Sequence, residues 1–147
     1  MTGEGQAAPR LRHDFPVQRV ISTRWEDEDF YGHVNNVVYY SFFDTAVNGF
    51  LIAASGADIR TLDAVGLVAE TQCEFLRELR FPGNVQAGIS VDRIGSSSIV
   101  YRIGLFQGES EEPAAIGRFV HVYVDHVTRE VTPIPDVIRA AVEPLVR

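Results

Sequence analysis

Asp29, His33, Asn35 and Asn36 lie close together in the chain, directly before a long apolar segment, residues 37–54. We expect that segment to be a helix, and the start of a helix offers unpaired N–H groups and the positive end of the helix dipole. A carboxylate beside such N–H groups supplies a base or nucleophile together with a binding site for an oxyanion. These are the parts needed to hydrolyse an activated acyl group.

Three carboxylates near the helix start have different expected roles. From the residue types alone, Asp27 and Asp29 are better explained as capping groups that face water. Asp27 is expected to be structural and to pair with Arg24. Asp44, inside the apolar segment, is a rival to Asp29 for a chemical role, although we favour a contact with a polar neighbour across a dimer interface.

His33 is a general base or a group that positions its neighbours, and we favour positioning. Asp27, Asp29 and His33 do not have the spacing of a known metal site, and no second cluster of ligands accompanies them, so we expect neither a metal nor a cofactor. Cys73 shares a predicted strand face with apolar residues and is expected to be a small buried side chain. His121, between two aromatic residues of one strand face, is expected in the core or at an interface.

The composition fits one globular domain and excludes some classes of partner. The chain has 147 residues and a net charge of −7, which argues against nucleic-acid binding and against an anionic membrane surface. All basic residues are Arg, so lysine Schiff-base chemistry is excluded. The single Cys, the lack of a signal-like N-terminus and the lack of an unbroken membrane-length apolar run predict a soluble, cytoplasmic protein.

The apolar segment is predicted to be a central helix. Residues 1–14 are predicted to be a loose tail, and residues 15–147 one domain. The polar residues of the segment form one narrow stripe at helical spacing, so most of the helix must be covered by other elements. Asn35 or Asn36 is the expected N-cap, and Gly56 the expected end. The stripe consists of Ser41, Asp44, Thr45 and Asn48.

The rest of the chain is predicted to be mostly strands. One strand precedes the helix and four consecutive, hairpin-forming strands follow it. A short C-terminal helix, 137–145, is expected with Asp136 as its cap. This order predicts an α+β fold, with an antiparallel sheet wrapped around one long central helix. The expected strands are 16–25, 67–75, 85–94, 99–106 and 115–127.

The chain resembles hotdog-fold acyl-CoA thioesterases, in particular the branch similar to 4-hydroxybenzoyl-CoA thioesterase. The resemblance rests on residues 24–29, on Gly32 to Asn36 and on Tyr39, and it extends over roughly residues 17–140. It implies dimers whose sheets join edge to edge, often paired into homotetramers. It also implies an active site at the dimer interface, with coenzyme A lying along the neighbouring subunit.

The resemblance also implies roles for individual residues. Asp29 matches the catalytic carboxylate of the family, and the N–H of Asn36 matches the group that polarises the thioester carbonyl. His33 and Asn35 would then position these groups, and Tyr39 would line the acyl site. Asp29 would attack the carbonyl directly, which gives a mixed anhydride, or deprotonate a water molecule, and the sequence does not distinguish these routes.

Residues 75–102 carry four arginines against two acidic residues, although the whole chain is acidic. Arg77, and Arg93 with Ser96, Ser97 and Ser98 at a predicted hairpin, are candidates to bind the phosphates of coenzyme A. The alternative is a set of solvated arginines beside a serine turn. The function predicted is acyl-CoA hydrolysis; the rivals are a non-catalytic acyl-thioester-binding protein and a thioesterase that acts on acyl-ACP.

Overall fold

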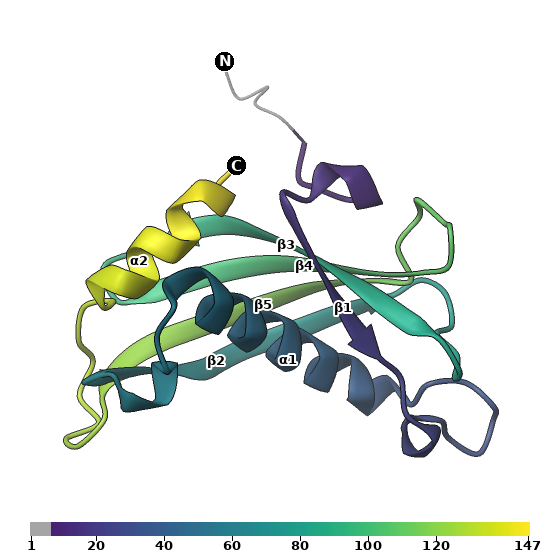
Figure 1. The fold of residues 1–147 in the computed structure, drawn as a ribbon, viewed down its shortest axis with the longest axis horizontal. Coiled ribbons are helices and arrows are strands. Elements are labelled where there is room, and N and C mark those ends of the chain that lie inside the picture. Colours follow the sequence, from purple (N-terminus) through teal and green to yellow (C-terminus); the bar gives the residue numbers. More distant parts are fainter. Residues whose placement is uncertain (1–6) are drawn as a thin grey trace.

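The computed structural model describes residues 7–147, which form one antiparallel sheet curved around a central helix (Figure 1). The strand order in the sheet is β1-β3-β4-β5-β2. The predicted α+β fold with a central helix is confirmed. The elements are β1 (Val17–Ser22), α1 (Asn36–Ser55), β2 (Ala64–Phe75), β3 (Asn84–Ile94), β4 (Ser98–Gln107), β5 (Ala115–Asp125) and α2 (Asp136–Val142).

Helix α1 begins and ends where its capping residues predict. The Asn35 side chain accepts a hydrogen bond from the N–H of Val37 at 3.0 Å, and Gly56 ends the helix with a φ of 69°. The predicted polar stripe faces away from the sheet, and its residues 41, 44 and 45 are exposed. By length and composition α1 is apolar enough to cross a membrane, but here its apolar side packs into the core.

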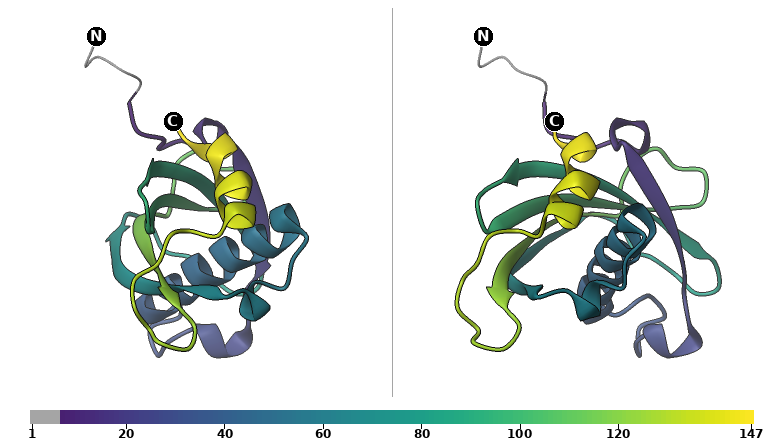
Figure 2. Two further views of the ribbon diagram at one scale, coloured as in Figure 1. Left: turned by 90° about the vertical axis from the view of Figure 1, so that its left-hand side faces the viewer. Right: turned by 60° about the vertical axis from the view of Figure 1, so that its left-hand side comes forward.

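Helix α1 lies on the concave face of the sheet (Figure 2), and Phe43 fixes its distance from β5. Phe43 is fully buried over Gly117, and a Cβ atom at position 117 would lie 2.3 Å from its ring. Only glycine therefore allows this close approach of helix and strand. Helix α2 packs against α1, and Ile138 and Val142 join the same core.

Strand β2 does not form a hairpin with β3, which corrects the prediction of four consecutive hairpin-forming strands. It pairs instead with β5, from Ala64 opposite Asp125 to Phe75 opposite Ala115. The connection 76–83 runs past the start of α1, where the N–H of Val34 donates to the carbonyl of Leu79 at 2.8 Å. This crossover is what encloses the helix, and it leaves β2 as an edge strand.

The N-terminal segment covers part of the convex face of the sheet. Phe15 is buried over Gly88 and Gly104, which lie directly opposite each other on β3 and β4. A Cβ atom at either glycine would lie within 2.7 Å of the Phe15 ring. Because the two glycines have no side chains, they leave a shallow depression in the sheet, here called the Phe15 seat, which the Phe15 ring fills.

Of the predicted loose tail, residues 1–14, the structure describes residues 7–14. Residues 1–6 lie outside the described residues, and Arg12–Asp14 form a short 3-10 helix. The Arg12 side chain donates to the carbonyls of Gly108 and Ser110, at 2.7 and 3.0 Å. The expectation therefore does not hold for Arg12–Asp14, because they are bound to the loop that follows β4.

The C-terminal helix was predicted to be capped by Asp136. Its N-cap is instead Pro135, with no side-chain hydrogen bond, and Asp136 is the first helical residue. An acidic residue in the first turn still stabilises the helix through its dipole. The last part of the predicted helix, Glu143–Leu145, is a 3-10 turn.

Candidate functional site

A tight turn between η2 (Trp25–Asp27) and α1 presents Asp29 beside His33. The N–H of Asp29 donates to the carbonyl of His33 at 2.9 Å, and Gly32 closes the turn with a φ of 82°, which favours glycine. The Asp29 Oδ1 atom accepts from the N–H of Tyr31 at 2.8 Å, and Oδ2 lies 3.7 Å from Nδ1 of His33. The carboxylate is 18% exposed, so the turn holds it in a mostly enclosed position.

Asp27 is structural, as predicted. Its side chain is 1% exposed and accepts from the N–H of Arg24 at 2.7 Å and from Nη2 of Arg24 at 2.9 Å. Its carbonyl accepts from the N–H of Asn35 at 2.9 Å. A buried carboxylate satisfied in this way fixes the approach of the chain to the helix start.

A cavity of about 240 Å³ lies at the start of α1. Asn36 is the first helical residue, so its N–H has no acceptor inside the helix and forms part of the positive end of α1. Asp29 is not among the lining residues, but its Oδ2 lies 3.7 Å from Nδ1 of His33, which does line the cavity. The cavity is lined by His33, Asn36, Tyr39, Phe75, Leu76, Arg77 and Glu78. The structure thus brings together His33, Asn36, Tyr39 and Arg77 of the predicted site residues.

Tyr39 ties the wall of this cavity to the helix. Its hydroxyl donates to the carbonyl of Arg77 at 3.4 Å and accepts from the N–H of Leu79 at 3.2 Å. Its ring packs edge-on against Phe75, with 5.0 Å between the ring centroids. Burial raises the pKa of Tyr39 above its ordinary value, so the hydroxyl remains a donor.

We expect Tyr39→Phe to lower the free energy of unfolding by about 1–2 kcal/mol, because the buried N–H of Leu79 loses this acceptor. Urea denaturation measures the change. Tyr40→Phe is the matched control, since the Tyr40 hydroxyl has no hydrogen bond within residues 7–147. Equal stability of the two variants would contradict a structural role for the Tyr39 hydroxyl.

Sequence reasoning missed Glu78 and Arg80 as parts of the site. Glu78 lines the cavity, and its Oε1 lies 3.9 Å from Nε2 of His33. The Arg80 guanidinium donates to the carbonyl of Gly32 at 2.8 Å. The only sequence signal was a charged connection after a predicted strand, which is typical of ordinary surface.

Two predicted groups lie away from the cavity within one chain. Arg93 and Ser96 to Ser98 belong to the β3–β4 hairpin, at the end of the sheet remote from the start of α1 (Figure 1). The backbone of that hairpin is already engaged, since the carbonyls of Ser96 and Ser97 accept from Ile134 and Tyr123. Their role in binding phosphates stays a prediction.

Asp44, the rival carboxylate, is exposed on α1. It accepts from the Asn48 side chain at 3.0 Å, one helical turn later. This contact with a polar neighbour lies within the same helix.

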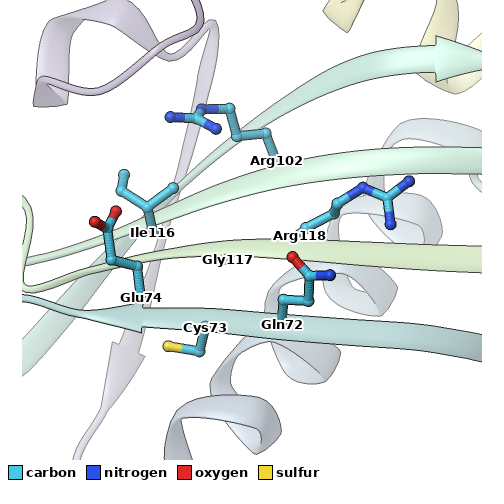
Figure 3. A pocket seen from close by; sticks show the side chains of 7 residues that line it. All are labelled: Gln72, Cys73, Glu74, Arg102, Ile116, Gly117 and Arg118. Atoms are coloured by element: carbon cyan, nitrogen blue, oxygen red, sulfur yellow. The ribbon is translucent and has the colours of Figure 1, made fainter.

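A second cavity, of about 310 Å³, lies on the convex face of the sheet. Arg102 and Arg118 face each other across β4 and β5, and their side chains point in opposite directions (Figure 3). Arg118 pairs with Glu70, and Nε of Arg102 donates to the carbonyl of Pro9. The diverging arginines each have a partner, so they do not converge on one ligand.

Cys73 belongs to the same stretch of β2, but its sulfur points away from the side chains of Gln72 and Glu74 (Figure 3). Burial raises the pKa of the thiol to about 12, so it is not a thiolate at neutral pH. Within the described part of the chain, no three His, Cys, Asp or Glu side chains cluster in a way that would hold a metal ion.

His121 is a core residue and lies on the sheet face that packs against α1. It is 2% exposed, its ring contacts those of Tyr101, Phe119 and Tyr123, and its Nδ1 has no hydrogen-bond partner among residues 7–147. Burial lowers the pKa of His121 to about 4, so the ring is neutral at pH 7.

His121 makes the fold sensitive to acid. The unfolded chain takes up a proton at this residue near pH 6.5 but the folded chain only near pH 4, so stability is full above pH 6.5 and falls as the pH drops toward 4. The loss amounts to about 3 kcal/mol. We expect wild type to lose that much more than His121→Phe between pH 7 and pH 4 in urea denaturation. Parallel curves would contradict a neutral buried ring.

Comparison with known proteins places the chain in a family. The model of the thioesterase-like superfamily matches residues 23–142. A solved structure of the PA5185 protein from Pseudomonas aeruginosa is 44% identical and covers 94% of this chain and 97% of that one, with a TM-score of 0.89.

Two further relatives are more distant. A Thermus thermophilus thioesterase, solved with coenzyme A and Zn, is 27% identical, covers 89% of this chain and 94% of that one, and has a TM-score of 0.74. The uncharacterised protein YsmA of Bacillus subtilis is 25% identical over 71% of this chain and 69% of its own length. Because the family model spans most of the domain, this chain belongs to the thioesterase-like superfamily, has its hotdog fold and is a thioester hydrolase.

Proposed function

We propose that this thioester hydrolase acts on acyl-CoA, producing a carboxylic acid and free coenzyme A. The observation that carries the proposal is the cavity at the start of α1, which is lined by Asn36 and by His33, with Asp29 in contact with the His33 ring. A thioester carbonyl placed there would have an oxyanion donor, the N–H of Asn36, and the Asp29 carboxylate of the turn nearby. No metal takes part in this scheme.

The carbonyl oxygen of the substrate binds at the N–H of Asn36, and the positive end of α1 stabilises the charge that develops on it. Asp29 removes a proton from a water molecule that attacks the carbonyl carbon, or attacks that carbon itself to give an anhydride that water then cleaves. In both routes the C–S bond breaks and coenzyme A leaves as a thiolate. Because Asp29 does not line the cavity but contacts His33, which does, the reacting carbon belongs beside the turn.

The cavity walls favour an apolar or aromatic acyl group, since Tyr39, Phe75 and Leu76 line it. Arg77 at the same cavity offers a cation to the phosphates of coenzyme A. The coenzyme A in the Thermus thermophilus relative supports this carrier over an acyl carrier protein.

A second copy of the chain would complete the site. Strand β2 is an edge strand and exposes Leu67, Val68 and Phe75, at 45, 47 and 42%. Two copies paired along β2 would cover these side chains. They would also place the partner beside the cavity, because Phe75, which lines the cavity, is the last residue of β2. We propose such a homodimer, with dimers pairing into tetramers, in the cytoplasm.

The test is release of free thiol from a panel of acyl-CoA substrates of different length and aromatic character. Steady turnover of at least one substrate is expected, with the same acyl group on a carrier protein hydrolysed more slowly. Tight binding of acyl-CoA without thiol release would favour the non-catalytic alternative, and preference for the carrier protein would favour the acyl-ACP alternative.

A further inference from the structure

The connection between β2 and β3 contains an arginine that bridges two parts of the candidate site. Nη1 of Arg80 donates to the carbonyl of Gly32 at 2.8 Å, and Nη2 donates to Oε2 of Glu78 at 2.6 Å. Gly32 belongs to the turn that carries Asp29, whereas Glu78 lines the cavity. One planar guanidinium therefore joins the turn to the cavity wall.

This bridge places His33 between two carboxylates. With Oε2 of Glu78 held by Arg80, the other oxygen, Oε1, lies 3.9 Å from Nε2 of His33. On the other side of the ring, Oδ2 of Asp29 lies 3.7 Å from Nδ1. The charge of Arg80 offsets that of Glu78, so an anionic substrate does not meet two uncompensated carboxylates.

The backbone on which Arg80 stands is fixed on both sides. Its N–H donates to Oε1 of Gln107 at 3.0 Å, and its carbonyl accepts from Nε2 of the same side chain at 2.8 Å. The neighbouring N–H of Phe81 donates to Oε2 of Glu28 at 3.0 Å. The Arg80 side chain is 60% exposed, but the backbone that carries it is held by Gln107 of β4 and by Glu28 at the start of the turn.

We propose that Arg80 and Glu78 are positioning residues of the thioesterase site: the Gly32–Arg80–Glu78 bridge sets the place of the Asp29–His33 turn at the cavity and the orientation of the His33 ring. The inference rests on the proposed function, because the reacting groups that it positions are those of that reaction. An ordinary exposed ion pair would contribute little to stability and nothing to turnover.

The test compares Glu78→Gln, Arg80→Met and the double variant. Each single change is expected to lower kcat about tenfold with little change in KM. The double variant should also lose only about tenfold relative to wild type, because both changes break the same bridge. Arg80→Lys should resemble Arg80→Met, since an ammonium lacks the planar fork that makes both contacts. Both side chains are more than half exposed, so the variants should fold.

The matched control is Arg60→Met. Arg60 also pairs with a carboxylate two residues earlier, Asp58, at 2.9 Å, but it lies beyond the other end of α1. Its loss should leave kcat unchanged. A double variant whose loss is the product of the two single losses would overturn the bridge.

A second measurement does not depend on turnover. The ring-nitrogen NMR shifts of His33 should change in both Glu78→Gln and Arg80→Met but not in Arg60→Met. If wild type hydrolyses no acyl-CoA, the proposed function fails while these shifts still test the bridge. Unchanged His33 shifts in both variants would overturn the inference.

Discussion

Asp29→Asn should lower kcat for acyl-CoA hydrolysis by at least about 100-fold, the usual effect of removing a general base or nucleophile. The amide keeps the size of the side chain, and its oxygen still accepts from the N–H of Tyr31, so the turn should remain folded. It neither takes a proton from water nor attacks a carbonyl. Thiol release measures the loss, and circular dichroism checks the fold.

Asp44→Asn is the matched control for this experiment. Asp44 is the exposed carboxylate on α1, bonded to Asn48, and its change should leave kcat within about twofold of wild type. Loss of turnover in Asp44→Asn with near-normal turnover in Asp29→Asn would move the chemistry from the turn to the helix.

Phe15→Ala should lower the free energy of unfolding by about 4 kcal/mol, because a buried aromatic ring is removed and the glycines beneath it have no side chains to fill the space. Urea denaturation measures the change. Val20→Ala, a 64% exposed residue of β1, is the control and should alter stability by less than about 0.5 kcal/mol. A loss below about 1 kcal/mol would mean that Phe15 does not occupy its seat in solution.

A double-mutant cycle sharpens this prediction. Gly104→Ala alone should destabilise the protein, since its Cβ atom would lie 2.7 Å from the Phe15 ring. In the Phe15→Ala background the same change should cost less, because the methyl group enters the space left by the ring and is crowded only by Phe106, whose ring would lie 2.9 Å away. Additive effects would contradict direct packing of Phe15 on Gly104.

The parts of the fold that depend on local chemistry were predictable from sequence. Asn35 and Gly56 mark the ends of α1 because capping needs particular side chains at particular backbone angles. The place of β2 was not predictable, because alternation fixes which face a residue takes but not which strand lies alongside. Closure of the sheet around α1 decides that pairing.

The candidate site divides in the same way. The proximity of Asp29, His33 and Asn36 was predictable because they are neighbours in the chain and belong to one turn and one helix start. Glu78 and Arg80 reach that turn only through the crossover connection, so their charges looked like ordinary surface. The residues near Pro9 and Arg12 had the composition of a tail, yet their contacts are with segments distant in sequence.

The contact between Phe43 and Gly117 has a consequence at the start of α1, where the Asn36 N–H lies. The helix is a stiff rod, and the depth at which this one ring sits against β5 sets the tilt of the whole rod. Any side chain at position 117 would push Phe43, and with it α1, away from β5. The Asn36 N–H would then move relative to Asp29 and His33 of the turn. A substitution at this buried point would therefore shift the start of α1 without altering a residue that lines the cavity there.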